Sequence, residues 1–159
     1  MDRFKKAVET VLKHEGGYAS HPDDPGGETK YGICKRSYPH LDIKRLTREQ
    51  AKEIYRRDWW DKYGYERIND DALCFKVFDL AVNMGAHQAH KLLQRAVNDV
   101  SGRLLEDDGI LGPRTISAVN AIVPELVLDA LLKRAESYYR SLNKPQFLAG
   151  WLNRLYDKA

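Results

Sequence analysis

The sequence lacks the features that mark membrane proteins and exported proteins. No apolar run in its 159 residues approaches the roughly 18 residues that a membrane-spanning helix needs. Residues 1–9 are charged and amphipathic, without the continuous apolar core and small-residue cleavage site of a signal peptide. We therefore expect a compact protein made in the cytoplasm, which needs a separate route for any role outside it.

Cysteine is scarce, and charge of neither sign is concentrated. Cys34 and Cys74 are too few for a disulfide framework and fit no zinc spacing, so we expect two reduced, partly buried thiols. His87 and His90 share a helical face but lack a third ligand, so we expect no metal and no cofactor. The 26 Lys and Arg residues are interspersed with 23 Asp and Glu residues, for a net charge of +3. This distribution disfavours a nucleic-acid binder but suits a polyanionic polymer as partner.

The pattern of apolar residues predicts a mainly α fold with a small β-hairpin after the first helix. Apolar residues at three- and four-residue steps predict a helix over residues 3–15, which Gly16-Gly17 end at a position needing positive φ. Short segments around Tyr18 and residues 31–33 are expected to pair as the hairpin. Further helices are predicted from a Thr47–Gln50 capping box to about Trp60, from Asp70 or Asp71 to Gly85, and over 86–100, 113–121, 124–142 and 145–156.

The polar residues after the first helix have the layout of a sugar-cleaving site. Glycoside hydrolysis needs a protonated carboxylic acid on one side of the bond and a second polar group that handles water or stabilises positive charge. Glu15 ends the helix, where the negative end of the helix dipole and the apolar residues one turn earlier favour the protonated acid. If the following segment folds back, Asp24 and Thr29 face Glu15. The plainer alternatives are a solvated glutamate and, for Asp23 and Asp24, ordinary turn residues.

The run Glu-Gly-Gly-Tyr at residues 15–18, with residues 24–33, closely resembles glycoside hydrolase family 108, the N-acetylmuramidase family of phage endolysins and secretion activator proteins. The family's motif glutamate, which is taken as catalytic, maps onto Glu15. The spacing to Asp24 and Thr29 is similar to the Glu/Asp/Thr arrangement of phage-type lysozymes, with an Asp-to-Thr interval one residue shorter. The resemblance implies a lysozyme-like fold and cleavage of the β-1,4 bond after N-acetylmuramic acid in peptidoglycan.

The C-terminal half carries a second resemblance. Its motif Asp-Gly-x-x-Gly-x-x-Thr-x-x-Ala at residues 108–118 resembles a predicted peptidoglycan-binding module. The bland alternative is a turn and helix start that only pack against the preceding helix. We expect a lysozyme-like block over residues 1–86 and a peptidoglycan-binding block over residues 88–156, packed as one body because no linker separates them.

Several residues are candidates for substrate binding around Glu15. They are Gly16, Gly17, Tyr18, Tyr31 and Asn83, of which Asn83 lies in a second family-like block at residues 78–85. An aromatic cluster, Tyr55, Trp59, Trp60, Tyr63 and Tyr65, is either a cleft wall that stacks on sugars or part of the core, and core packing is the commoner fate.

Two function classes remain on the sequence. The favoured one is an N-acetylmuramidase with Glu15 as general acid and Asp24 and Thr29 as helpers, acting on the cell wall or periplasm after release or export by a holin or another partner. The residues alone do not separate it from a glucosaminidase or a lytic transglycosylase. The other class is a non-catalytic peptidoglycan-binding protein or secretion helper.

Overall fold

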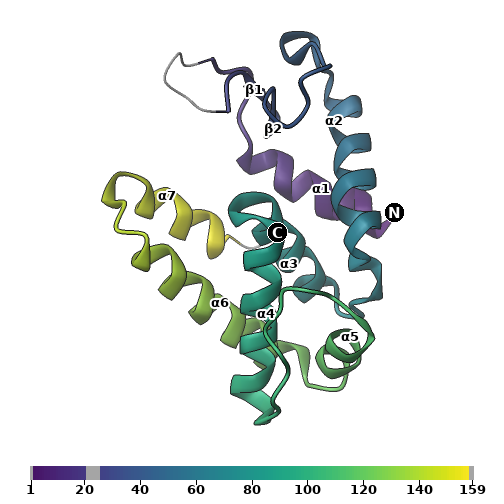
Figure 1. Cartoon of the computed structure of the whole chain (residues 1–159), viewed down its shortest axis with the longest axis vertical. Coiled ribbons are helices and arrows are strands. Elements are labelled where there is room, and N and C mark those ends of the chain that lie inside the picture. Colours follow the sequence, from purple (N-terminus) through teal and green to yellow (C-terminus); the bar gives the residue numbers. More distant parts are fainter. Residues whose placement is uncertain (1, 21–25, 158–159) are drawn as a thin grey trace.

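The computed structural model describes residues 2–20 and 26–157 of the chain. Within these ranges the chain forms seven α-helices and one two-stranded sheet. The helices are α1 (Arg3–His14), α2 (Arg48–Tyr55), α3 (Asp71–Met84), α4 (Ala86–Ser101), α5 (Pro113–Asn120), α6 (Pro124–Ser141) and α7 (Pro145–Leu155). The predicted mainly α class with a hairpin after the first helix is confirmed (Figure 1).

The helix starts follow the capping signals of the sequence. Thr47 Oγ1 accepts a hydrogen bond from the Gln50 backbone N–H at 3.1 Å, and the Gln50 side chain returns one to the Thr47 N–H at 2.9 Å. Asp70 caps α3 by accepting from the Leu73 N–H at 2.9 Å, and a proline opens each of α5, α6 and α7. No single helix in the described ranges is long and apolar enough to cross a membrane; α5 and α6 reach that length and composition only as a pair bent by 116°.

The hairpin differs from the predicted one in its strands. β1 (Thr29–Lys30) pairs antiparallel with β2 (Ile33–Cys34), and a single bridge from Ala19 to β1 extends the pairing. Tyr31 and Gly32 form the turn, with φ of 53° and 79°. Positive φ at both central residues is the geometry of a type I′ turn, which matches the twist of the flanking strands. The residues expected as a strand around Tyr31 are therefore the turn, because the sequence offers no Asn-Gly signal to mark it.

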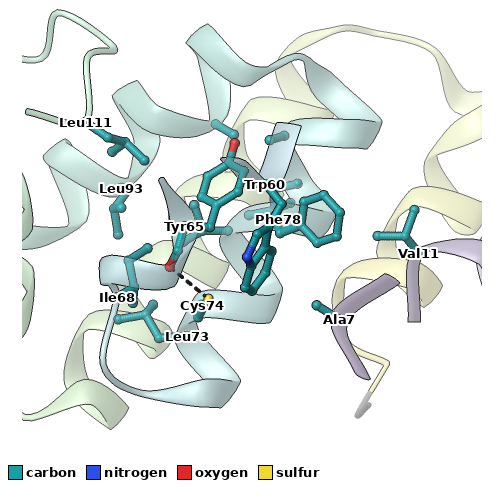
Figure 2. Packing of buried hydrophobic residues seen from close by; sticks show 14 of the residues in the cluster. Ala7, Val11, Trp60, Tyr65, Ile68, Leu73, Cys74, Phe78, Leu93 and Leu111 are labelled. Carbon is teal, nitrogen blue, oxygen red and sulfur yellow. Dashed lines mark hydrogen bonds between the residues drawn. The ribbon is translucent and has the colours of Figure 1, made fainter. Parts of the chain in front are cut away.

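Helix α3 occupies the centre of the fold, where it contacts α1, α4 and α6 (Figure 1). Its Phe78 ring packs edge-on against Trp60 at 5.5 Å between centroids and lies 5.7 Å from the Tyr65 ring (Figure 2). Cys74 is buried beside them, with its thiol 3.2 Å from the Tyr65 carbonyl oxygen. Both cysteines are free thiols, Cys34 being partly buried, as expected.

One hydrophobic cluster includes side chains from both predicted blocks. Val77 of the first block and Leu93, Val127 and Leu131 of the second belong to it. Helix α4 packs along α6, and α3 contacts both. The division of the chain near residues 86–88 stays a prediction.

The motif at residues 108–118 closes the loop between α4 and α5. Gln94 of α4 is fully buried, and its side-chain amide donates to Asp108 Oδ1, the Ile110 carbonyl and Thr115 Oγ1 at 3.0–3.1 Å. Its carbonyl oxygen accepts from the Gly109 N–H at 2.9 Å, and Gly109 has a φ of 76° that favours glycine. The motif's Asp, Gly and Thr thus satisfy one buried amide, which is the packing role of the bland alternative.

His90 is a second buried polar group in this region. Its Nδ1 lies 3.1 Å from the Gly109 carbonyl oxygen, and its Nε2 lies 2.7 Å from the Tyr65 hydroxyl. Because a carbonyl only accepts, Nδ1 carries the proton and Nε2 accepts from the tyrosine. Burial lowers the pKa of His90 to about 4, although the bond to Gly109 opposes the shift. The folded protein therefore holds this imidazole neutral at neutral pH.

The buried imidazole should make the protein less stable in mild acid. An unfolded histidine has a pKa of about 6.5, so between that pH and about 4 the unfolded chain binds a proton that the folded chain does not. We expect the free energy of unfolding to fall by up to about 3 kcal/mol over this range, as the pH drops. Chemical denaturation from pH 7.5 to 4 measures it. His90→Gln should flatten this part of the slope and His40→Gln, at an exposed histidine, should not; equal slopes in the two variants would contradict the assignment.

Candidate active site

Glu15 leaves the end of α1 in an extended conformation. Its φ and ψ are −87° and 131°, and its backbone N–H still bonds to the Val11 carbonyl at 3.1 Å. Gly16 and Gly17 follow without positive φ, so the expectation of positive φ at these glycines is wrong: Glu15 itself breaks the helix by going extended. Both glycines are exposed, and no atom lies within 4 Å of where a Cβ would stand on either. Their backbone is open to an approaching ligand.

The hairpin turn is held against Glu15. The Tyr31 N–H donates to the Gly16 carbonyl at 3.0 Å, and the Tyr55 hydroxyl of α2 donates to the Tyr31 carbonyl at 2.8 Å. A Cβ on Gly32 would collide with the Tyr55 hydroxyl and would stand 2.9 Å from Glu15 Cδ. Burial and the Glu15 charge raise the pKa of Tyr55 above its usual range, so its hydroxyl stays a neutral donor. Because Gly32 has no side chain, the hairpin turn can pack closely against both Tyr55 of α2 and Glu15.

Arg154 of α7 joins Glu15 to α3. Its Nη1 lies 2.8 Å from Glu15 Oε1, and its Nη2 lies 2.8 Å from Asp79 Oδ1. Its Nε is 3.2 Å from both Asp79 oxygens, so the guanidinium donates to that carboxylate through two nitrogens, Nε and Nη2. The side chains of Arg154, Asp79 and Glu15 are 10%, 4% and 20% exposed. Burial alone would lower the pKa of Arg154, but the bonds and charges of Asp79 and Glu15 raise it overall, and the group stays charged.

Asn83 lies one helical turn after Asp79 and belongs to the same network. Its Nδ2 donates to the Tyr139 hydroxyl of α6 at 2.7 Å, and its Oδ1 is 3.5 Å from Arg154 Nη1. Burial raises the pKa of Tyr139 to about 12, which keeps this hydroxyl neutral. The structure therefore brings Asn83 to the Glu15 network, and its proposed contact with substrate stays a prediction.

Two further contacts fix the end of α7 against α1 and α3. Lys76 Nζ donates to the Leu155 carbonyl at 2.7 Å, which satisfies one of the carbonyls at the end of the helix. Asp157 Oδ2 lies 2.8 Å from Nε2 of His14, the residue that precedes Glu15. The same oxygen lies 2.8 Å from Lys13 Nζ. These contacts hold the end of α7, which carries Arg154, against both α1 and α3.

The other predicted site residues lie around the hairpin. Thr29 is in β1, and Tyr18 is 41% exposed with its hydroxyl 2.5 Å from Glu28 Oε2. Tyr31 is half-buried in the turn. Asp24, like Asp23, lies outside the described residues. Over the described ranges, no group of three or more His, Cys, Asp or Glu side chains could hold a metal ion.

Arg154, Asp79 and Tyr139 belong to this site and were not predicted from the sequence, and Tyr55 was predicted only as part of an aromatic cluster that is either a cleft wall or core. Asp79 and Asn83 carried a usable signal, since they are two polar residues four apart in the otherwise apolar stretch 77–84 and so share one face of the helix. Arg154 carried none: it is one of 26 basic residues and lies 139 positions after Glu15.

The comparisons with known proteins cover nearly the whole chain. Residues 8–85 match the family model described as Glycosyl hydrolase 108, and residues 88–156 match the one described as Predicted Peptidoglycan domain. A solved structure titled as Brucella abortus SagA is similar with a TM-score of 0.80 and 28% sequence identity, over 96% of this chain and 88% of that chain. No curated protein matches the chain. The match to the predicted peptidoglycan domain includes the position of Arg154.

The crowding at Gly32 predicts a large cost for one added methyl group. Gly32→Ala places an L side chain at a φ of 79° and against the Tyr55 hydroxyl, and we expect it to lower the free energy of unfolding by about 2–4 kcal/mol. Gly17→Ala has open space and should change it by less than about 0.5 kcal/mol. Urea unfolding of both variants measures the difference; equal effects would mean that Gly32 is not confined as described.

The buried ion pairs predict that Arg154 matters far more than a surface arginine. Arg154→Met leaves the Asp79 charge buried without its partner, and we expect a loss of about 3–5 kcal/mol in the free energy of unfolding. The matched control is Arg134→Met, which breaks a half-exposed pair with Asp99 and should cost about 0–1 kcal/mol. Chemical denaturation at neutral pH compares them. A cost for Arg154→Met no greater than that of the control would refute the central role of this pair.

Proposed function

Because residues 8–85 belong to the glycosyl hydrolase 108 family and residues 88–156 to the predicted peptidoglycan domain family, we propose that the chain is an N-acetylmuramidase. The family resemblance found in the sequence is confirmed by both matches. At the coarser level, the chain is a lysozyme-like glycoside hydrolase that acts on peptidoglycan. The finer proposal is that it cleaves the β-1,4 bond between N-acetylmuramic acid and N-acetylglucosamine, with Glu15 as general acid.

The way Glu15 is held carries this proposal. One carboxyl oxygen, Oε1, accepts from Arg154, while Oε2 makes no hydrogen bond within the part of the chain that the structure describes. Protonation at Oε2 keeps the bond to Arg154, since Oε1 then accepts as a carbonyl oxygen. The guanidinium thus selects the oxygen that carries the proton, and Oε2 is the oxygen available to a substrate.

Asp79 offsets the positive charge that Arg154 places beside Glu15. Here the bidentate contact with Asp79 balances the positive charge, so the pair next to Glu15 is close to neutral. We assign Arg154 and Asp79 as positioning residues, because they act through Glu15.

In the proposed reaction, the Glu15 proton passes to the glycosidic oxygen as the C1–O bond breaks. A water adds to C1 and its proton is released to the solvent, from which Glu15 is protonated again. Asp24, helped by Thr29, positions this water or stabilises the oxocarbenium-like transition state. No second glutamate stands at an obvious nucleophile position in the sequence, which favours inversion over retention. We further propose that the protein reaches the wall after release or export with a holin or another partner.

The second candidate is a non-catalytic peptidoglycan-binding protein or secretion helper. The observation that favours it is the Glu15–Arg154 ion pair itself, since a purely structural glutamate would make the same contact. The two candidates differ in whether new chain ends form on purified cell walls.

Replacement of the proposed acid tests the function directly. Glu15→Gln keeps an oxygen for Arg154 but has no proton to give, so we expect a loss of about 10²–10⁴-fold in the release of reducing ends, with the fold intact. Mass spectrometry of the fragments should show reducing N-acetylmuramic acid ends. Anhydro ends would instead indicate a lytic transglycosylase, and reducing N-acetylglucosamine ends would indicate a glucosaminidase.

The control is Glu136→Gln, at a glutamate of α6 paired with Arg140, which should cleave at the wild-type rate. Wild-type activity in Glu15→Gln would overturn the assignment of the acid. Binding to walls by the wild-type chain without any new ends would favour the non-catalytic candidate.

A further inference from the structure

The aromatic cluster predicted from the sequence divides into two halves in the structure. Tyr55, Trp60 and Tyr65 are at most 1% exposed and belong to the core, where the last two pack on α3 (Figure 2). Trp59 and Tyr63 are only half-buried, so part of each side chain is accessible from outside the core. The chain turns as a π-helix over Arg56–Asp61, and the wider turn points neighbouring side chains in directions that an α-helix would not.

Trp59 and Tyr63 line a pocket of about 400 Å³ that lies beside the C-terminal end of α3. Tyr38, from the segment after the hairpin, is the third aromatic residue in its wall. Asp58 and Lys62 supply polar groups beside the rings, while Val82 and Gly85 of α3 and its cap close the opposite side. We call this cavity the Trp59 pocket. Its volume and its mixture of rings with a few polar groups are those of a small-molecule site.

The Trp59 pocket is one aromatic ring away from Glu15. The Trp59 ring lies 5.2 Å from the Tyr55 ring, and the Tyr55 hydroxyl meets Glu15 at the confined Gly32. On the opposite wall, Val82 directly precedes Asn83, which belongs to the Glu15 network. The pocket wall thus contacts Tyr55 and is continuous along α3 with Asn83, and both of these residues belong to the Glu15 site.

The chemistry of the pocket suits an uncharged sugar ring. Aromatic faces offer an apolar surface to the C–H face of a pyranose, and carboxylates accept from its hydroxyls. Asp58 accepts from the Tyr38 hydroxyl at 2.5 Å and from Arg57, and the bond to Arg57 first, then that to Tyr38, lowers its pKa against the effect of burial. It is therefore an ionised acceptor held in place. Lys62, with Nζ 5.4 Å from the Tyr63 ring, adds a donor at the rim.

We propose that the Trp59 pocket is a subsite for one N-acetylated hexosamine ring of the glycan strand, next to the bond presented to Glu15. The choice of this ligand rests on the proposed function. Trp59 and Tyr63 bind the ring by stacking, and Asp58 accepts a hydrogen bond from a sugar hydroxyl.

Binding is measured apart from cleavage to test the subsite. The full chain carrying Glu15→Gln is titrated by calorimetry with a β-1,4-linked tetramer of N-acetylglucosamine, which this variant is not expected to cleave. Trp59→Ala removes the stacking surface, and Ser37→Trp fills the pocket from an exposed position on its rim without removing any buried group. We expect each to raise the Kd at least tenfold.

The matched control is Phe147→Ala, which removes an aromatic side chain, 52% exposed, on α7 and outside the pocket. It should change the Kd less than twofold. Unchanged binding by both Trp59→Ala and Ser37→Trp, or no binding of the tetramer to the parent variant, would overturn the subsite. Since Trp59 also touches Tyr55, a loss seen in Trp59→Ala alone, with Ser37→Trp binding normally, would count as a packing effect and against it.

These measurements distinguish failure of the subsite from failure of the proposed muramidase activity. Pocket-dependent binding in a protein whose wild-type form releases no reducing ends would retain the subsite and reject the muramidase. Cleavage of cell walls with an unchanged KM in Ser37→Trp would retain the enzyme and reject the subsite.

Discussion

The ion-paired cluster of Arg154, Asp79 and Glu15 is the interaction on which the rest of the site depends. It brings together the end of α1, the centre of α3 and the last turn of α7, three segments far apart in the sequence. Its charges are almost removed from water, so each is tolerated only while the others are present. The same contact that stabilises the fold therefore sets the position of the proposed acid.

This dependence gives the C-terminal segment a part in the proposed chemistry. The segment that matches the predicted peptidoglycan domain supplies the arginine that orients Glu15, which lies in the segment that matches the glycosyl hydrolase. Lys76 of α3 binds the Leu155 carbonyl, and Asp157 pairs with Lys13 of α1, so the end of α7 that carries this arginine is tied to both helices. In this chain, the proposed acid is complete only when both segments are folded against one another.

Local patterns predicted the helices well because capping and apolar periodicity act over a few residues. The Thr47–Gln50 capping box, the Asp70 cap and the proline starts are all as predicted. The π-helical turn over Arg56–Asp61 was not predicted. The hairpin register was not predictable, since it depends on Tyr55 and Gly32 meeting Glu15 across the fold. For the same reason the motif marked Glu15, whereas the arginine that holds it carried no signal of its own.

The central claim is that Glu15, held by Arg154, donates a proton to the departing oxygen. The most direct measurement compares Glu15→Gln with the wild-type chain on peptidoglycan and on an aryl β-glycoside of N-acetylmuramic acid with an acidic phenol as leaving group. A leaving group that needs no proton makes a general acid dispensable. We expect a large loss of rate on peptidoglycan and a small one on the aryl glycoside. Equal losses on the two substrates would contradict it.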